Sequence, residues 1–182
     1  MSNGEPALKR RPTAGPAARL RLATVADAAL LAQLRYELRT GITIDVTPEP
    51  GFHERCTEWM AARLPWSDVW RCWLAEDELG EPLGVVWLQF LEKLPNPVGE
   101  PGLHGYVTGL YVREAARNRG VGTALLDAAL AACEERGIDT VFLWPTVRSR
   151  ALYVRHGFAE QSGMLARRIW AGTAHPEERQ TG

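Results

Sequence analysis

The sequence predicts a single mixed α/β domain, and three observations support that prediction. The chain has 182 residues, of which 46% are apolar and 24% are charged, as in an ordinary globular domain. Its first half holds two neighbouring runs with the pattern of antiparallel strands. Its second half alternates strand-like and helix-like segments, which indicates parallel strands joined by a crossover helix. We expect the domain to span residues 19–172, between a disordered leader (1–18) and a flexible tail (173–182).

The predicted domain begins with a short strand and a helix. Leu20 and Leu22 alternate with a polar residue, which favours a strand. Thr24 and Asp27 have the spacing of a capping box and predict a helix start. Leucines then recur every three to four residues, so the helix would bury one stripe. We expect Gly41 to end it.

A second helix and a hairpin are predicted next. The helix would cover 52–63, because Pro65 prevents it from continuing. Two apolar runs, 69–75 and 84–91, flank a charged, glycine-containing turn and predict an antiparallel pair.

Tryptophan is frequent in this first half of the chain. Alternation places Trp70 and Trp73 on opposite faces of one strand. Core packing accounts for most of these side chains, because tryptophan has a large surface to bury. An aromatic wall for an organic amine, including Trp66 or Trp87, is the alternative hypothesis.

The second half predicts the order strand, helix, strand, helix, strand. The expected segments are a strand at 104–113, a helix at 120–136, a strand at 140–144, a short helix at 146–156 and a last strand from Phe158 through 164–170.

Charge and residue usage exclude several classes of protein. The net charge is −1 and the pI is about 6.4, so no large positive field would hold nucleic acid. The three cysteines are far apart and form no CxxC pair, and the histidines lack paired metal-ligand spacing. We therefore expect no disulfide framework, no metal and a reducing cytoplasmic location. No apolar run reaches the ~18 residues of a membrane span.

A glycine-containing loop precedes the long helix. It has the pattern Arg117-x-x-Gly120-x-Gly122, and a helix start offers unpaired N–H groups and the positive end of a dipole. The glycines leave room for an anion, and Arg117 and Arg119 add charge, so the loop predicts a cradle for a diphosphate. A Rossmann fingerprint fails because its third glycine position is Leu125, and a Walker loop fails because no lysine is present. A simple glycine helix start with solvated arginines remains the alternative.

Two motifs together resemble the GNAT superfamily of acyl-CoA-dependent N-acetyltransferases. One is the loop 117–122 after the strand residues 110–112, and the other is Arg-Ala-Leu-Tyr-Val-Arg-His-Gly-Phe at 150–158. The resemblance extends over about residues 20–170. It implies an α/β fold with a mixed central sheet, whose two parallel strands splay apart around acyl-CoA.

The resemblance also implies an activity and a set of site residues. The activity is direct transfer of an acetyl group from acetyl-CoA to a primary amine in a ternary complex, without a metal. Main-chain groups of Leu110, Tyr111 and Val112 would bind the pantetheine arm, and the Leu110 N–H would polarise the thioester carbonyl. Tyr153 would be the general acid. The pyrophosphate would be surrounded by Arg117, Asn118, Arg119, Gly120, Val121, Gly122 and Thr123.

Thr146 departs from the family pattern, which often has asparagine at this position. Threonine can cap the helix and accept one hydrogen bond, but it lacks the second donor of the amide. Ser149 likewise replaces a common alanine. These changes weaken side-chain contacts to the pantetheine and leave the main-chain contacts in place.

The general base stays open. Alternation places three residues on one face of the strand before the loop, and none is a carboxylate: Tyr106, Thr108 and Leu110. His104 on the same face, Glu37, Asp45 and a water molecule are the candidates.

Two features of the function also stay open. The acceptor could be a small-molecule amine or a protein amine, and a homodimer is compatible with the resemblance although no sequence feature demands one. The alternative function is a non-catalytic module of the same fold that binds or senses acyl-CoA. Tyr153 favours the enzyme, whereas the missing carboxylate favours the sensor.

Overall fold

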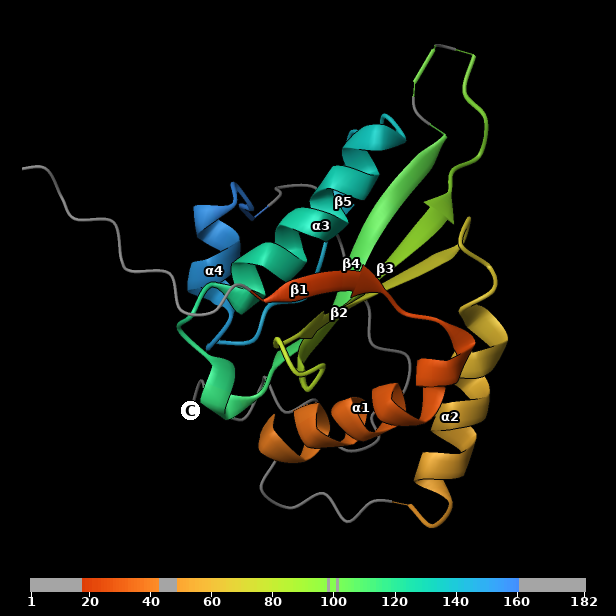
Figure 1. Ribbon diagram of the computed structural model, residues 1–182. Helices are drawn as coiled ribbons and strands as arrows, with labels where there is room; N and C mark the ends of the chain where they lie inside the picture. The colour runs from red at the N-terminus through yellow and green to blue at the C-terminus, as the bar shows by residue number, and fades with distance from the viewer. Residues whose placement is uncertain (1–17, 43–48, 98, 101, 161–182) are drawn as a thin grey trace, which may run out of the picture.

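The computed structural model describes residues 18–42, 49–97, 99–100 and 102–160, and within them a mixed sheet forms the centre of the domain (Figure 1). The strands lie side by side in chain order. Neighbouring strands are antiparallel except for β4 and β5, which are parallel. The predicted mixed α/β class is therefore confirmed. The strands are β1 (Arg19–Leu22), β2 (Trp70–Glu76), β3 (Pro82–Glu92), β4 (Leu103–Val112) and β5 (Val141–Phe142).

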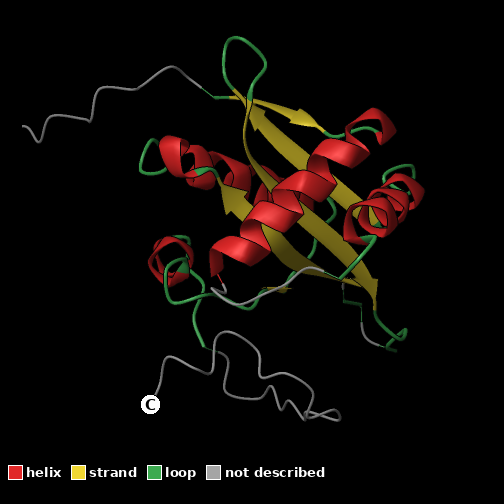
Figure 2. Ribbon diagram, turned by 90° about the horizontal axis from the view of Figure 1, so that it is seen from below, coloured by secondary structure: helices red, strands yellow, loops and turns green. Residues whose placement is uncertain are grey.

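Helices cover both faces of the sheet. Helices α1 (Ala28–Ile42) and α2 (Phe52–Arg63) pack on one face, and the view from their side shows helices crossing the strands (Figure 2). Helix α3 (Val121–Glu135) is the crossover between β4 and β5 and packs on the other face, while α4 (Arg150–Arg155) follows β5. Short 3₁₀ turns precede α1 and follow β4.

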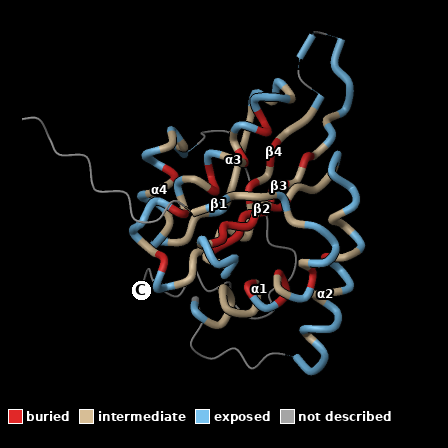
Figure 3. Tube along the Cα trace, in the orientation of Figure 1, coloured by how far each residue is buried: buried red, intermediate tan, exposed pale blue. Residues whose placement is uncertain are grey.

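Each face of the sheet has its own core, and the buried residues concentrate along the central strands (Figure 3). Leu74 and Trp87 pack under α1 and α2. Leu88 and Val107 pack under α3. Trp70 and Trp73 lie on opposite faces, as alternation predicts. The strand pattern thus separates a core beneath α1 and α2 from a core beneath α3.

Strand β4 contains a bulge that alternation does not predict. Val85 pairs with Tyr111 and Trp87 with Thr108, so one extra residue stands in β4 between these pairs. Gly109 has φ = 62°, a left-handed conformation that favours glycine, and a Cβ there would lie 3.3 Å from the Trp87 ring. The bulge shifts the alternation of every residue after it.

Several element boundaries differ from the predicted ones. Helix α2 agrees with its prediction, but α1 continues one residue past Gly41. Strand β5 covers only Val141–Phe142 of the predicted 140–144, and Pro145 just beyond the predicted end has no N–H to extend a ladder. Residues 158–160 form no strand. The rest of the predicted last strand, residues 1–17 of the predicted leader (1–18) and the predicted tail (173–182) lie outside the described residues.

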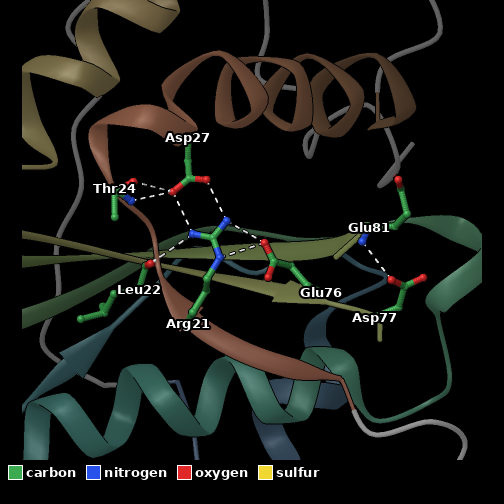
Figure 4. A network of polar contacts seen from close by, with 7 residues as sticks. All are labelled: Arg21, Leu22, Thr24, Asp27, Glu76, Asp77 and Glu81. Carbon is green, nitrogen blue, oxygen red and sulfur yellow. Dashed lines mark hydrogen bonds and ion pairs between the residues drawn. The ribbon is translucent and has the colours of Figure 1, made fainter. Parts of the chain in front are cut away.

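An ion-pair network anchors the start of α1 to the sheet (Figure 4). Arg21 of β1 donates two 2.8 Å hydrogen bonds to Asp27 and one of 2.8 Å to Glu76 of β2. Asp27 also accepts from the Thr24 N–H at 2.7 Å, which confirms the capping contact. Glu76 is buried, with 8% of its surface exposed, and Arg21 is the cation that pairs with it.

The network makes stability depend on pH in the acid range. The hydrogen bonds from Arg21 hold the pKa of Asp27 at about 2, below its ordinary value of 3.8. Above pH ~4 this carboxyl is ionised in the folded and the unfolded chain, so its stabilisation is complete. As the pH falls toward 2 the unfolded chain binds the proton first, and the stabilisation is lost. Urea unfolding between about pH 5 and pH 2.5 should give a steeper fall in unfolding free energy for the wild type than for Asp27→Asn. Parallel curves would contradict this account.

Candidate active site

A long groove runs between β4, the loop before α3, and α4. Its volume is about 1320 Å³, which is above the range of roughly 300–1,000 Å³ common for small-molecule clefts. Residues 106–112 of β4 form one wall, and residues from Trp144 to Arg155 form the opposite one. Such a groove suits an elongated ligand.

The wall formed by β4 presents backbone groups that no strand pairs with in the described structure. Strand β5 pairs with β4 only at two positions, Gly105 and Tyr106. Beyond the bulge, Arg113 donates its N–H to Leu83 of β3, and Tyr111 pairs with β3 as well. Since backbone groups alternate along a strand, Leu110 and Val112 direct theirs into the groove. The expected splay of the parallel strands is therefore present.

The bulge corrects one prediction about β4. Alternation had placed Tyr106, Thr108 and Leu110 on one face. In the structure Leu110 and Val112 pack against the core beneath α3, whereas Tyr111 packs beneath α1. The extra residue at the bulge exchanges the two faces from Leu110 onward, so Leu110 does not share a face with Thr108. Gly109 was the available signal, because glycine within a strand often marks a bulge.

The loop before α3 has the backbone of an anion cradle. Asn118 and Gly120 have positive φ angles of 59° and 84°, and such turns direct successive N–H groups into a concavity. The Arg117 side chain donates to the Val112 carbonyl at 3.1 Å, which ties the loop to the end of β4. A Cβ at Gly122 would lie 3.5 Å from Leu152 and 3.6 Å from Val112, so a larger side chain would enter the groove.

Most of the predicted ligand-binding residues line the groove together: Leu110, Tyr111, Val112, Arg117, Asn118, Gly120, Gly122, Thr123, Thr146 and Tyr153. Two of the predicted residues are not part of its lining. Arg119 is exposed, and the side chain of Val121, the first residue of α3, is buried, so only their backbone groups are candidates for the cradle.

Tyr153 lies on the α4 wall with its ring against Phe158, 5.8 Å between centroids. Burial raises the pKa of its phenol to about 12, against the opposing effect of a hydrogen bond from Ser149. Its O–H is therefore protonated at neutral pH. Thr146 accepts from the Ser149 N–H at 3.2 Å, and its own N–H donates to the Ser149 hydroxyl at 2.9 Å. Thr146 and Ser149 thus stabilise the turn that precedes α4, the helix that carries Tyr153.

Two of the candidate bases, His104 and Glu37, are not part of the groove lining. His104 lies near the start of β4 against Phe142, about 20 Å along the strand from Leu110. Although burial alone would raise the pKa of Glu37, two hydrogen bonds from Arg113, at 2.9 and 3.1 Å, lower it. Glu37 therefore joins α1 to Arg113, the residue that directly follows β4. Asp45 lies outside the described residues.

A second cavity adjoins the groove, and Trp87 of the hypothesised aromatic wall lines it. Its volume is about 230 Å³, and it lies between α1, α2 and the sheet. Trp59, Trp70 and Trp87 line it and pack edge to face, with ring centroids 5.3 to 6.0 Å apart. Arg35 of α1 lines both the cavity and the groove. Trp66 is exposed and takes no part in the cavity lining.

The described residues offer neither a metal centre nor a membrane-spanning helix. No group of three or more His, Cys, Asp or Glu side chains in this part of the chain could hold a metal ion. None of the helices described is long and apolar enough to cross a membrane.

Comparisons with known proteins agree with this geometry. A family model described as the acetyltransferase (GNAT) family matches residues 39–158. A mycothiol acetyltransferase from Beutenbergia cavernae is 35% identical over 97 residues, which are 51% of this chain and 30% of that protein. This chain therefore matches less than a third of the length of that relative.

Solved structures share the fold over most of the chain. A predicted acetyltransferase with acetyl-CoA from Clostridium acetobutylicum has a TM-score of 0.72 and 22% identity, covering 84% of this chain and 97% of that one. A GCN5-related N-acetyltransferase from Ralstonia eutropha has a TM-score of 0.70 and 28% identity, covering 83% and 98%. The family model matches more than half of the chain, and the fold and groove agree with it: the chain belongs to the acetyltransferase (GNAT) family.

Proposed function

We propose that the protein transfers the acetyl group of acetyl-CoA directly to a primary amine in a ternary complex. The strongest support is that two groups needed for the transfer line the same groove, one on each wall. The backbone of Leu110 faces the groove from the open edge of β4, and Tyr153 lines the opposite wall. The acetyl-CoA held by the Clostridium structure, which has the same fold, supports the choice of donor.

The residues of the groove fit acetyl-CoA, which would supply an activated acetyl group. The open edge of β4 can accept the peptide-like pantetheine arm as an added strand. The cradle from Arg117 to Thr123 can hold the pyrophosphate through N–H groups, the α3 dipole and the Arg117 guanidinium.

The chain's own groups then have separate tasks in the transfer. The Leu110 N–H would donate to the thioester oxygen and stabilise the negative charge that develops there as the amine attacks. The Tyr153 O–H would donate its proton to the departing sulfur when the carbon–sulfur bond breaks. The nitrogen loses one proton to water, and water returns a proton to Tyr153.

Water is the proposed proton acceptor because the described groove lining has few side chains that could accept a proton. Its one carboxylate is Glu114, which is exposed and lies in the turn after β4. Arg35 and Arg39 line the acceptor end of the groove. Nearby positive charge disfavours an ammonium ion, so an amine bound there would lose its proton more easily.

Binding of CoA is tested by thermal unfolding. With CoA at about 100 times its Kd, the wild type should gain about 2.7 kcal/mol, a rise in Tm of roughly 5 °C or more. Gly122→Val places methyl groups between Val112 and Leu152 and should abolish the rise, whereas Gly122→Ala makes only ordinary contacts and should keep it. Gly102→Val, where a Cβ meets nothing within 4 Å, is the matched control. No rise in the wild type would refute the groove as a CoA site.

Turnover separates the enzyme from a sensor of the same fold. Release of free thiol from acetyl-CoA is measured with a panel of amines, alongside mass detection of the acetylated product. We expect amine-dependent release. Tight CoA binding with no release on any amine would instead establish the non-catalytic alternative.

A further inference from the structure

The cavity beside the groove has an apolar wall and one cationic residue. The three tryptophans, with Leu31, Leu34 and Met60, form its apolar surface. Arg35, Leu38, Thr108 and Gly109 line both the cavity and the groove, so the two spaces meet next to the bulge of β4. Leu110 follows directly, so a ligand in the cavity would lie near the proposed site of acetyl transfer.

Arg35 stands at this junction without an acidic neighbour in the described structure. Burial lowers the pKa of its guanidinium, and the charge of Arg39 acts in the same direction. Its other titratable neighbours are Cys56 and Tyr106. Burial raises the pKa of the Cys56 thiol, so that group is neutral and balances no charge. A partly desolvated guanidinium with no carboxylate beside it favours binding of an anion.

The charged residues that line the groove also favour an anionic ligand. Among the described residues that line it are one carboxylate, Glu114, and five guanidinium groups: Arg35, Arg39, Arg117, Arg148 and Arg155. Arg117 lies at the cradle, whereas Arg35 and Arg39 belong to α1 at the other end. This field repels polyamines and lysine-rich peptides and attracts acceptors that carry an anionic group.

We propose that the acceptor amine carries a carboxylate that binds Arg35 and an apolar group that fills the tryptophan-lined cavity. This proposal rests on the proposed function, because it names the second substrate of the same site. A planar guanidinium can hold a carboxylate through two parallel hydrogen bonds, which would orient the amine toward Thr108 and Leu110. The volume of about 230 Å³ suits a side chain such as an aromatic ring. The acceptor class is therefore an amino acid or a similar small amine with an apolar side chain.

Direct binding tests this without requiring turnover. The probes are 3-phenylpropionate and its neutral amide, titrated into the protein with and without CoA while tryptophan fluorescence is followed. We expect the carboxylate to bind roughly 10- to 100-fold more tightly than the amide, because hydrogen bonds between charged groups have this magnitude. Arg35→Gln should bring the ratio close to one, and Arg35→Lys should restore part of it.

The matched control is Arg19→Gln, an exposed arginine of β1 at the opposite edge of the sheet, which should behave as the wild type. Equal affinity for the two probes, saturable binding of neither, or an unchanged ratio in Arg35→Gln would each overturn the proposal.

Turnover separates failure of this inference from failure of the proposed function. L-Phenylalanine and phenethylamine differ only in the carboxylate, and thiol release is measured with both. We expect a higher kcat/KM for phenylalanine and a loss of that preference in Arg35→Gln. Equal or better use of phenethylamine by the wild type would refute the carboxylate site while the acetyltransferase function stands. The proposed function fails on different results, namely no thiol release with any amine and no stabilisation by CoA.

Discussion

Replacing Tyr153 with phenylalanine is expected to lower kcat about 100-fold or more and to leave the KM for acetyl-CoA near its wild-type value. A positioned proton donor commonly contributes this much, and the change removes only the O–H. The ring keeps its contact with Phe158, 5.8 Å between centroids, so the wall of the groove should survive. Steady-state kinetics with the best amine of the panel measure both constants.

The control and the pH profile make this expectation specific. Tyr36→Phe, in a tyrosine of α1 that packs on Phe52 and His53 outside the groove lining, should not change kcat. Because burial raises the pKa of Tyr153 to about 12, its proton stays in place up to that pH. The wild type should therefore show no loss of kcat from this residue between neutral pH and about pH 10. A Tyr153→Phe enzyme with unchanged kcat would remove the general acid from the mechanism.

Replacing Arg21 with methionine is expected to lower the free energy of unfolding by about 2 kcal/mol. In the wild type, Arg21 forms its shortest contacts with both Asp27 and Glu76. The variant leaves Glu76 buried beside Asp27 with no cation between them. The expected loss is smaller than the ~3–5 kcal/mol of a broken, fully buried pair, because about a third of the Arg21 side chain, 32%, is exposed to solvent. Urea unfolding followed by circular dichroism gives the value.

Two further variants test the cause of that loss. Arg19→Met, in the same strand but exposed, should change the unfolding free energy by no more than about 0.5 kcal/mol. The double variant with Arg21→Met and Glu76→Met should be more stable than Arg21→Met alone, because it removes the uncompensated charge. A double variant less stable than the single one would show that the loss comes from packing instead.

The sequence predicted those parts of the structure that depend on neighbouring residues. The loop 117–122, the following helix and the α4 segment with Tyr153 have local signals in glycine spacing, capping and apolar periodicity. Helix α2 likewise agrees because Pro65 limits it. These elements also place most of the candidate site.

Features that depend on distant residues could not be predicted in this way. Arg21 meets Glu76 only because β1 pairs with β2 across 55 positions of the chain. Arg35 lines both the cavity and the groove only because α1 packs beside α2 over the sheet. Both arginines look like ordinary polar positions in the sequence, and their partners come from the tertiary fold.

The bulge at Gly109 has a consequence for comparing this strand with its relatives. The pleat of β4 changes phase there, so the strand serves one hydrophobic layer with odd-numbered residues before the glycine and with even-numbered residues after it. Position 110 is therefore equivalent in environment to position 107, and position 111 to position 108. An alignment can assume that the side chains of this strand alternate between the two faces without a break. Over the last third of the strand, such an alignment would exchange interior and ligand-facing positions. Whether two substitutions in this part of the strand can be compared therefore depends on which face of the sheet each side chain occupies, as much as on the residue type.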